Sequence, residues 1–365
     1  MSPADLELLN RFQRDFPLIS DPFRVIAEQL GWSETEVLAS LRRLKDEGKV
    51  SRVGAVFATR RLGVSTLAAL AVPPMRLEAV AQRVNDYPEV NHNYQREHDF
   101  NLWFVLTAAT ASRLCAVLTD IEAKTGLSVL NLPLLEEFHV DLGFDLQCGG
   151  HKIPVATRAP MANPEPHGLK PFSAPDQGIL AALQPGLPLV SRPYHALAQV
   201  LGLSEQTVLE RLQQGLQQGI IKRLGIIVRH RELGYRANAM VVWDIPDTEV
   251  SAVGRALAME SGINLCYRRP RRLPHWPYNL FCMMHGRQRE PVLERIEQVR
   301  AAIANPTQQG LKPQGLTAYP YAVLFSGHCF RQRGAYYLPL AMPSPPAPFP
   351  ESGENWPSTS VGALA

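Results

Sequence analysis

Apolar residues recur along the first sixty positions with the period of an amphipathic helix. Leu6, Leu9 and Phe12 share one helical face, and Ser33 followed by Glu36 has the pattern of a capping box. We expect helices over 4–15, 22–31 and 33–47, and a β-hairpin over 50–63, where β-branched residues are frequent. Three helices followed by a hairpin predict a winged helix-turn-helix.

The period then changes to that of alternating strands and helices. We expect strands over 66–73, 89–97, 101–108 and near 134–140, with helices over 76–86 and 110–125. This order is βαββαβ, which predicts a ferredoxin-like domain.

The whole pattern occurs twice. Residues 5–63 align with 176–234 at a constant offset of 171, most clearly as VSRVGAVFATRRLG against IKRLGIIVRHRELG. The second copy predicts strands over 237–245, 263–268, 279–285 and near 316–325, with helices over 247–260 and 289–303. The expected fold class is therefore α+β, a tandem duplication whose halves pair as an intrachain pseudo-dimer, with larger homo-oligomers left open.

The repeat sets the domain boundaries. Winged helix-turn-helix units are expected over 1–63 and 175–234, and ferredoxin-like domains over 64–147 and 235–335. Prolines concentrate in 148–174, which we interpret as a linker, and in 336–365, which we expect to be a disordered tail.

Composition excludes several classes of protein. Charged residues make up 19% of the chain, and no apolar run approaches the roughly 20 residues that span a bilayer. The N-terminus is an amphipathic helix rather than a signal peptide. The five cysteines form no CxxC pair, so neither a disulfide framework nor a zinc site is expected. A cytoplasmic protein with reduced thiols and no membrane partner is predicted.

A winged helix followed by βαββαβ resembles the leucine-responsive/AsnC family of bacterial regulators. However, the helices that would enter the major groove begin with Glu34, Glu36, Glu205 and Glu210 and offer no Arg or Lys there. Carboxylates repel phosphates, and DNA binding needs several cations. We therefore expect these helices to be a scaffold that does not bind DNA. A transcriptional regulator is the alternative.

One strand carries an unusual set of polar residues. In NHNYQREHDFNLWFVL (91–106), alternate positions of the strand place His92, Tyr94, Arg96 and His98 on one face. Two imidazoles, a phenol and a guanidinium in register favour a functional site over a plain surface strand.

The second copy diverges at the same place. Asn264, Tyr267 and Arg269 match Asn91, Tyr94 and Arg96, whereas Leu265 and Arg271 stand opposite His92 and His98. A five-residue excess carries further candidate residues, His275, Trp276 and Tyr278, beside a cationic cluster of Arg268, Arg269, Arg271 and Arg272. The functional interpretation is a pocket for a flat ligand with several carboxylates, because Arg pairs with carboxylates and aromatic rings stack on planar faces. The alternative is an exposed basic hairpin.

Other groups are less informative. There is no phosphate-binding loop, and no metal site built from protein alone is indicated, although one His could be an axial ligand to an iron that the ligand brings. We expect His139, His285 and His328 to be structural or to support site residues without contacting the ligand, and no role for His151 and His167. Basic wing positions could reach the rim of the pocket; they are Arg52, Arg60, Arg61, Arg223, Arg229, His230 and Arg231.

HNYQREHDFNLWF in one half and YRRPRRLPHWPYNLFCMMHG in the other resemble the paired subunits of the siroheme decarboxylase family, in the fused form of the heme d1 pathway. The resemblance covers about 1–335. It implies a lyase that removes CO2 from the C12 and C18 acetates of siroheme, giving 12,18-didecarboxysiroheme without a redox step. It also implies no cofactor beyond the iron of the substrate.

The resemblance suggests roles for the candidate residues. His98 is expected to be the general acid, with His92 or His275 as a second acid or an iron-facing group. Tyr94 and Tyr267 would position the reacting side chain. The other carboxylates would be held by Arg96, Arg268, Arg269 and Arg271, with Trp276 and Tyr278 against the ring. A non-catalytic tetrapyrrole sensor remains an alternative.

Overall fold

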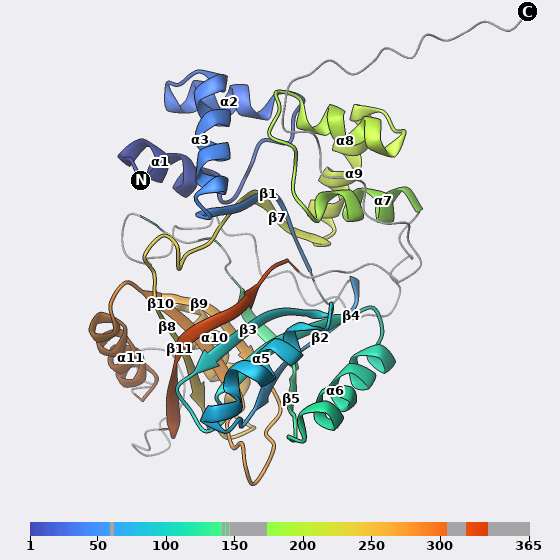
Figure 1. Cartoon of the computed structure of the whole chain (residues 1–365). Helices are drawn as coiled ribbons and strands as arrows, with labels where there is room; N and C mark the ends of the chain where they lie inside the picture. Colours follow the sequence, from blue (N-terminus) through green and yellow to red (C-terminus); the bar gives the residue numbers. More distant parts are fainter. Residues whose placement is uncertain (59–61, 141–142, 144–145, 147–173, 305–318, 335–365) are drawn as a thin grey trace, which may run out of the picture.

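The structure is a computed structural model that describes residues 1–58, 62–140, 143, 146, 174–304 and 319–334. The predicted linker over 148–174, apart from Ala174, and the predicted tail over 336–365 lie outside the described residues. Two helix-turn-helix units lie at one end of the molecule, and a large sheet with its helices lies at the other (Figure 1).

The helix-turn-helix units repeat with the predicted offset. The first unit has α1 (Pro3–Phe12), α2 (Pro22–Leu30) and α3 (Glu34–Asp46), and the second has α7 (Ala174–Leu183), α8 (Pro193–Leu201) and α9 (Glu205–Gln217). Every boundary shifts by 171 residues, as from 3 to 174. The duplication inferred from the sequence is confirmed.

The capping box predicted for α3 is present. The Ser33 hydroxyl accepts a hydrogen bond from the Glu36 backbone N–H at 3.2 Å, and the Glu36 carboxylate accepts one from the Ser33 N–H at 2.7 Å. These two bonds satisfy donors that the first helical turn leaves free. They also occupy the Glu36 carboxylate with its own helix.

The predicted wing hairpins are not formed. Instead β1 (Val50–Phe57) pairs antiparallel with β7 (Ile221–Val228), its counterpart in the other half, with Gly54 opposite Gly225. The strand that follows β1 is committed to the large sheet, so β1 takes its partner from the second unit. A Cβ on Gly225 would overlap the carbonyl oxygen of Gln13, which explains why glycine occupies this crossing point.

The large sheet has nine strands in the order β5-β2-β4-β3-β11-β8-β10-β9-β6. The first half supplies β2 (Val64–Leu70), β3 (Val90–Arg96), β4 (Leu102–Ala108), β5 (Leu130–Pro133) and β6 (Glu136–Val140). The second half supplies β8 (Ala237–Trp243), β9 (Ile263–Arg268), β10 (Leu280–Gly286) and β11 (Tyr321–Gln332).

The halves exchange their last strands. β6 of the first half pairs with β9 of the second, and β11 of the second half pairs with both β8 and β3. Each half therefore completes the sheet of the other, and the predicted pseudo-dimer within one chain is confirmed.

Four helices cover the outer faces of the sheet and leave an inner face between the halves. They are α5 (Leu77–Asn85), α6 (Ala111–Thr125), α10 (Val250–Met259) and α11 (Arg289–Ala304), and a 3-10 turn, η1 (Pro74–Arg76), precedes α5. The βαββαβ order is confirmed in both halves. The inner faces share one core, in which Trp103 of the first half lies with Phe281, Met240 and Trp276 of the second.

Candidate active site

Strand β3 directs His92 and Tyr94 toward the inner core between the halves. His92 lies opposite Val105 and Tyr94 opposite Trp103 on β4, and both of these partners face the inner core. The intervening Asn93 points the other way and donates to the Ala81 carbonyl of α5 at 3.1 Å. The alternation predicted for this strand is therefore confirmed as far as Arg96.

His98 does not belong to this row, so the expectation of four aligned side chains is wrong at its last member. β3 ends at Arg96 and residues 97–100 form a bend, because Arg96 N–H already bonds the Asn101 carbonyl across the turn at 2.8 Å. The His98 ring lies 5.4 Å from the Trp276 ring, and its Nδ1 accepts the Phe100 N–H at 3.0 Å. Partial burial lowers its pKa.

Trp276 closes the inner core beside His98. Its side chain is fully buried, and its ring lies 5.1 Å from Trp103 and 5.0 Å from Tyr278. The neighbouring His275 is exposed on the same connection between β9 and β10 (269–279), which we call the long hairpin. The structure therefore places Trp276 and Tyr278 in a group of packed aromatic rings, and His275 away from the other candidates.

Three imidazoles meet where β3 begins and β10 ends. They come from His92 on β3, His285 on β10 and His230 in the turn after β7, and we call them the imidazole cluster. The His230 and His285 ring centroids are 4.9 Å apart. Burial lowers the pKa of His92 and of His230 to about 4, and the neighbouring Arg231 and His92 add to the shift at His230. The pKa of His285 is also lowered well below its ordinary value, so all three rings are neutral at pH 7.

Two tyrosines occupy equivalent places in the two halves, and Tyr94 lies beside the cluster. The Tyr94 ring stacks 6.2 Å from His92, and burial raises the pKa of both Tyr94 and Tyr267. The Arg269 guanidinium lies 4.7 Å over the Tyr267 ring. Both phenols therefore keep their protons and can donate hydrogen bonds.

Three guanidinium groups face neutral partners: those of Arg96 and Arg269 are buried, and that of Arg231 is half-buried. Arg96 donates to the Leu324 carbonyl at 3.0 Å and lies 3.9 Å from the Met283 sulfur, and burial lowers its pKa to about 10. Arg231 donates to the Gly327 carbonyl at 2.9 Å and Arg269 to the Leu132 carbonyl. Nη1 of Arg231 and Nε of Arg269 are buried without a hydrogen-bond partner. No carboxylate of the described residues forms an ion pair with these three cations, an arrangement that favours an anionic ligand.

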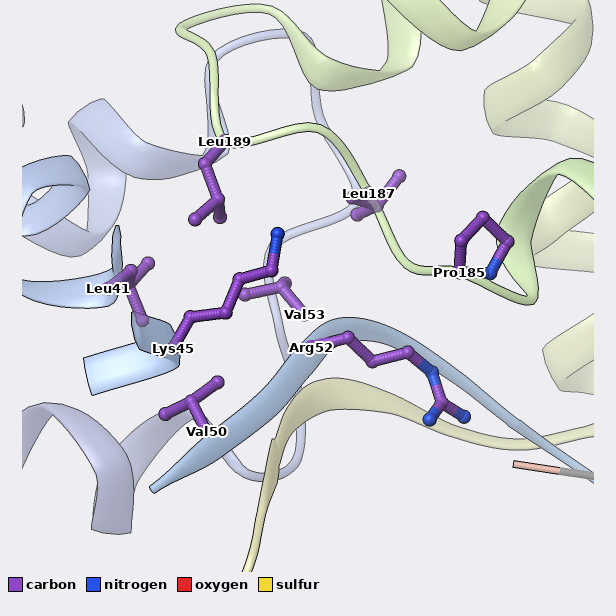
Figure 2. Close-up of a pocket in the computed structure, with 8 residues that line it drawn as sticks. All are labelled: Leu41, Lys45, Val50, Arg52, Val53, Pro185, Leu187 and Leu189. Atoms are coloured by element: carbon purple, nitrogen blue, oxygen red, sulfur yellow. The ribbon is translucent and has the colours of Figure 1, made fainter. Parts of the chain in front are cut away.

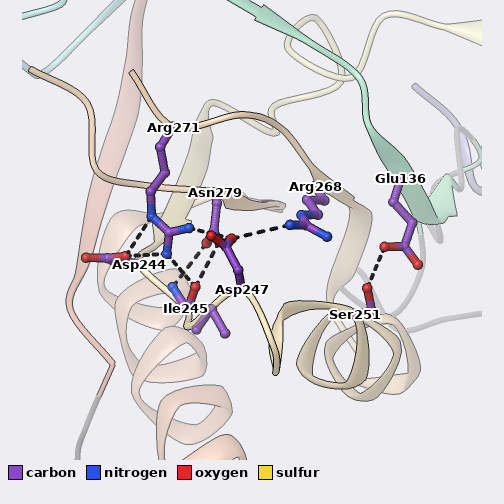
Figure 3. Close-up of polar contacts among 8 residues, drawn as sticks. All are labelled: Glu136, Asp244, Ile245, Asp247, Ser251, Arg268, Arg271 and Asn279. Atoms are coloured by element: carbon purple, nitrogen blue, oxygen red, sulfur yellow. Dashed lines mark hydrogen bonds and ion pairs between the residues drawn. The ribbon is translucent and has the colours of Figure 1, made fainter. Parts of the chain in front are cut away.

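Arg268 and Arg271, by contrast, already have carboxylate partners (Figure 3). Arg271 bonds Asp244 at 2.7 Å and Asp247 at 2.6 Å, and Arg268 bonds Asp247 at 3.3 Å. Asn279 donates to the same Asp247 at 3.1 Å. These arginines hold the long hairpin to the start of α10, so their charges are met within the protein.

The two halves are not equivalent at the cluster. His92 corresponds to Leu265 before the five-residue excess of the second half, and His285 corresponds to Thr107 after it. Within the described residues, imidazoles therefore gather at one of the two related positions, and residues of both halves build it.

Neither of two surface hollows suits a large flat anion. A cavity of about 20 Å³ between α3, β1 and residues 185–189 has room for about one water, with Arg52 and Lys45 at its edge (Figure 2). A wide groove of about 690 Å³ along α9 is lined by glutamines, aliphatic residues and Glu210, without a cation or an aromatic ring.

The described residues hold no group of three or more His, Cys, Asp or Glu side chains arranged for a metal ion. None of the described helices combines the length and apolar character needed to cross a bilayer.

Fold and site together define a tandem AsnC-like protein whose ligand-binding domains carry buried cations. The family model of the AsnC-like ligand binding domain matches residues 61–139 and 232–331, and that of the siroheme decarboxylase NirDL-like HTH domain matches 5–50 and 176–222. The siroheme decarboxylase NirDL subunit of Paracoccus denitrificans is 45% identical over 342 residues, covering 93% of this chain and 99% of the relative. The chain belongs to the siroheme decarboxylase family.

Two further similarities agree. The siroheme decarboxylase NirD subunit of Pseudomonas aeruginosa is 53% identical over 147 residues, 40% of this chain and 98% of that subunit, as expected if two subunits are fused here. The crystal structure of the siroheme decarboxylase NirDL in co-complex with an iron-uroporphyrin III analogue has a TM-score of 0.62 and 29% identity, covering 92% of this chain and 94% of that one. These relatives do not favour a DNA-binding regulator.

Part of the cluster was not predicted from the sequence. His285 was expected to be structural or to support site residues, and His230 and Arg231 to reach only the rim of the pocket. The turn after β7 brings His230 near His92 and Arg231 near Tyr94 on β3, and this approach of the two halves is not visible in either repeat alone. Of the other wing positions, Arg60 and Arg61 lie outside the described residues, and Arg229 is exposed.

Proposed function

We propose that this chain removes the carboxyl groups of the C12 and C18 acetates of siroheme, giving 12,18-didecarboxysiroheme, as a non-redox carboxy-lyase of heme d1 biosynthesis in the cytoplasm. The names of its relatives support the substrate. The observation that carries the proposal is the set of guanidiniums of Arg96, Arg231 and Arg269. They donate to the carbonyls of Leu324, Gly327 and Leu132 and form no ion pair with a carboxylate of the described residues.

Siroheme would supply the carboxylate partners that these cations lack. It is a flat tetrapyrrole with many carboxylates, and a carboxylate that replaces solvent at a buried guanidinium forms a strong charge-assisted hydrogen bond. Tyr94 and Tyr267 would donate further hydrogen bonds from the two halves. Arg268 and Arg271 would contribute indirectly, by holding the hairpin that carries Trp276.

The chemistry balances without an external oxidant or reductant. The bond between the acetate CH2 and its carboxylate breaks, CO2 leaves, and the electron pair stays on the carbon, where the conjugated macrocycle delocalises it. A proton then converts that carbon into a methyl group. The only metal in this proposal is the iron that the substrate carries.

The proton donor belongs to the imidazole cluster. The rings of His92, His230 and His285 are neutral in the substrate-free protein because burial lowers each pKa. A bound carboxylate raises the pKa of a nearby imidazole, so substrate binding draws a proton into the cluster. His98, which was expected to be the acid, bonds Phe100 and packs on Trp276 instead.

Single-turnover measurements with siroheme under anaerobic conditions test this assignment. We expect His230→Gln to slow formation of the first decarboxylated product by about 10²–10⁴-fold, the usual contribution of a general acid. His98→Gln is the matched control and should remain within about threefold of the unaltered protein. A full loss in His98→Gln with normal turnover in His230→Gln would reverse the assignment.

One chain is expected to suffice, because both halves that build the cluster lie in it. DNA is not an expected partner, since α3 and α9 begin with carboxylates.

A further inference from the structure

Two asparagines occupy the same place in the two halves, and each faces an imidazole nitrogen. Asn91 Oδ1 lies 2.8 Å from Nδ1 of His92, and Asn264 Oδ1 lies 2.9 Å from Nδ1 of His285. The asparagines correspond to one another in the duplication, although their imidazole partners do not. The shared feature is therefore the amide oxygen aimed at Nδ1.

A buried chain of hydrogen bonds fixes the direction of the Asn91 amide. The Thr107 hydroxyl donates to Ser65 Oγ at 3.2 Å, which turns its lone pairs toward Asn91. The Asn91 Nδ2–H group donates to Thr107 Oγ1 at 2.9 Å. Asn91 and Thr107 are 3% and 2% exposed, so water does not compete for these positions. The amide oxygen of Asn91 is then the atom left to face His92.

An amide oxygen can only accept, so the imidazole nitrogen opposite it must carry the hydrogen. His92 is then the Nδ1–H tautomer, and its Nε2 keeps a lone pair. The other ring nitrogen of a functional histidine is commonly set in this way by a neighbouring acceptor.

We propose that Asn91 is a positioning residue that, backed by Thr107 and Ser65, holds His92 as the Nδ1–H tautomer with its Nε2 lone pair available to siroheme. Asn264 stands in the corresponding place beside Nδ1 of His285. The inference rests on the proposed function and deepens it: His92 is a lone-pair donor of the cluster, and His230 carries the proton.

The tautomer can be read in the substrate-free full chain, by two-bond ¹H–¹⁵N correlation of protein with ¹⁵N-labelled histidine at pH 7. His92→Gln assigns the His92 signals. We expect a protonated Nδ1 and an unprotonated Nε2 at His92, and loss of this preference in Asn91→Leu. Asn264→Leu is the matched control, which should change the His285 pattern and leave that of His92 unaltered. An Nε2–H tautomer at His92 in the unaltered protein overturns the proposal.

Activity supplies the second readout. Removing the partner of a functional histidine commonly costs about 10- to 100-fold, and we expect a loss of that size in kcat for Asn91→Leu with a smaller change in KM. If Asn91→Leu does not fold, Thr107→Val removes the supporting hydroxyl at constant size and should weaken the same tautomer preference. A normal kcat together with a scrambled tautomer contradicts the positioning role. Because the tautomer is measured without siroheme, failure of the decarboxylase proposal would leave that result intact.

Discussion

Arg96→Met should weaken substrate binding while stabilising the empty protein. The Arg96 guanidinium is buried, its described contacts are the Leu324 carbonyl and the Met283 sulfur, and burial lowers its pKa to about 10. Methionine has a similar length and removes the buried charge. The two effects have opposite signs because the cation is matched only when a carboxylate is bound.

The magnitudes follow from these contacts. A hydrogen bond to a charged group contributes about 1.5–3 kcal/mol, and 1.4 kcal/mol is tenfold in affinity, so the Kd for siroheme should rise by about 10- to 150-fold. In the empty protein, replacing buried ionic groups by apolar side chains of similar volume is often neutral or stabilising, by about 1–4 kcal/mol where it stabilises. Loss of the bond to Leu324 costs roughly 1 kcal/mol. The free energy of unfolding should therefore rise, by up to about 3 kcal/mol.

Anaerobic absorbance titration with siroheme and urea unfolding of the substrate-free protein measure the two quantities. Arg271→Met is the matched control, because its guanidinium bonds Asp244 and Asp247. It should lose roughly 1 kcal/mol of stability and change the Kd by less than about threefold. If Arg96→Met is destabilised like the control and binds siroheme normally, the account of the unmatched cation is refuted.

Three other properties are predicted. The pKa of His92 is about 4 in the folded protein and 6.5 ordinarily, so the unfolded chain binds more protons between these pH values. The free energy of unfolding should therefore fall as the pH drops from 6.5 to about 4, and urea midpoints should show a shallower fall in His92→Leu. Gly225→Ala should lower the free energy of unfolding by about 3 kcal/mol, because its Cβ meets the Gln13 carbonyl. Gly54→Ala should lower it by about 1 kcal/mol in the same urea assay. Equal losses of stability would contradict the crossing described for β1 and β7. Trp276→Ala should destabilise by about 3–5 kcal/mol, since the ring is fully buried, and a loss of activity at unchanged stability would instead make it a substrate contact.

Much of the fold could be predicted because local signals and the repeat agree. Helix boundaries of the helix-turn-helix units follow from Ser33 and Gly31 in one copy and from Ser204 and Gly202 in the other. Strand exchange could not be predicted, because a strand sequence states which face is apolar but not which neighbour it takes. For the same reason the wing strands were assigned to hairpins, although β1 and β7 pair with each other.

Neighbouring residues of the candidate site could be predicted only where they lie on the same strand. Alternation placed His92, Tyr94 and Arg96 together, and failed at His98 because the strand ends at Arg96, two residues before it. His230 and His285 come from other elements of the second half, so no spacing in the sequence links them to His92. Asp244 and Asp247 likewise decide which arginines have a carboxylate partner, and both are distant in sequence from the long hairpin.

The most direct test of the central claim is anaerobic incubation of the purified chain with siroheme, followed by mass analysis of the tetrapyrrole. The account predicts successive loss of one and then two molecules of CO2, with the iron retained. Siroheme that binds and is recovered unchanged would contradict the decarboxylase and indicate a tetrapyrrole-binding protein without catalysis.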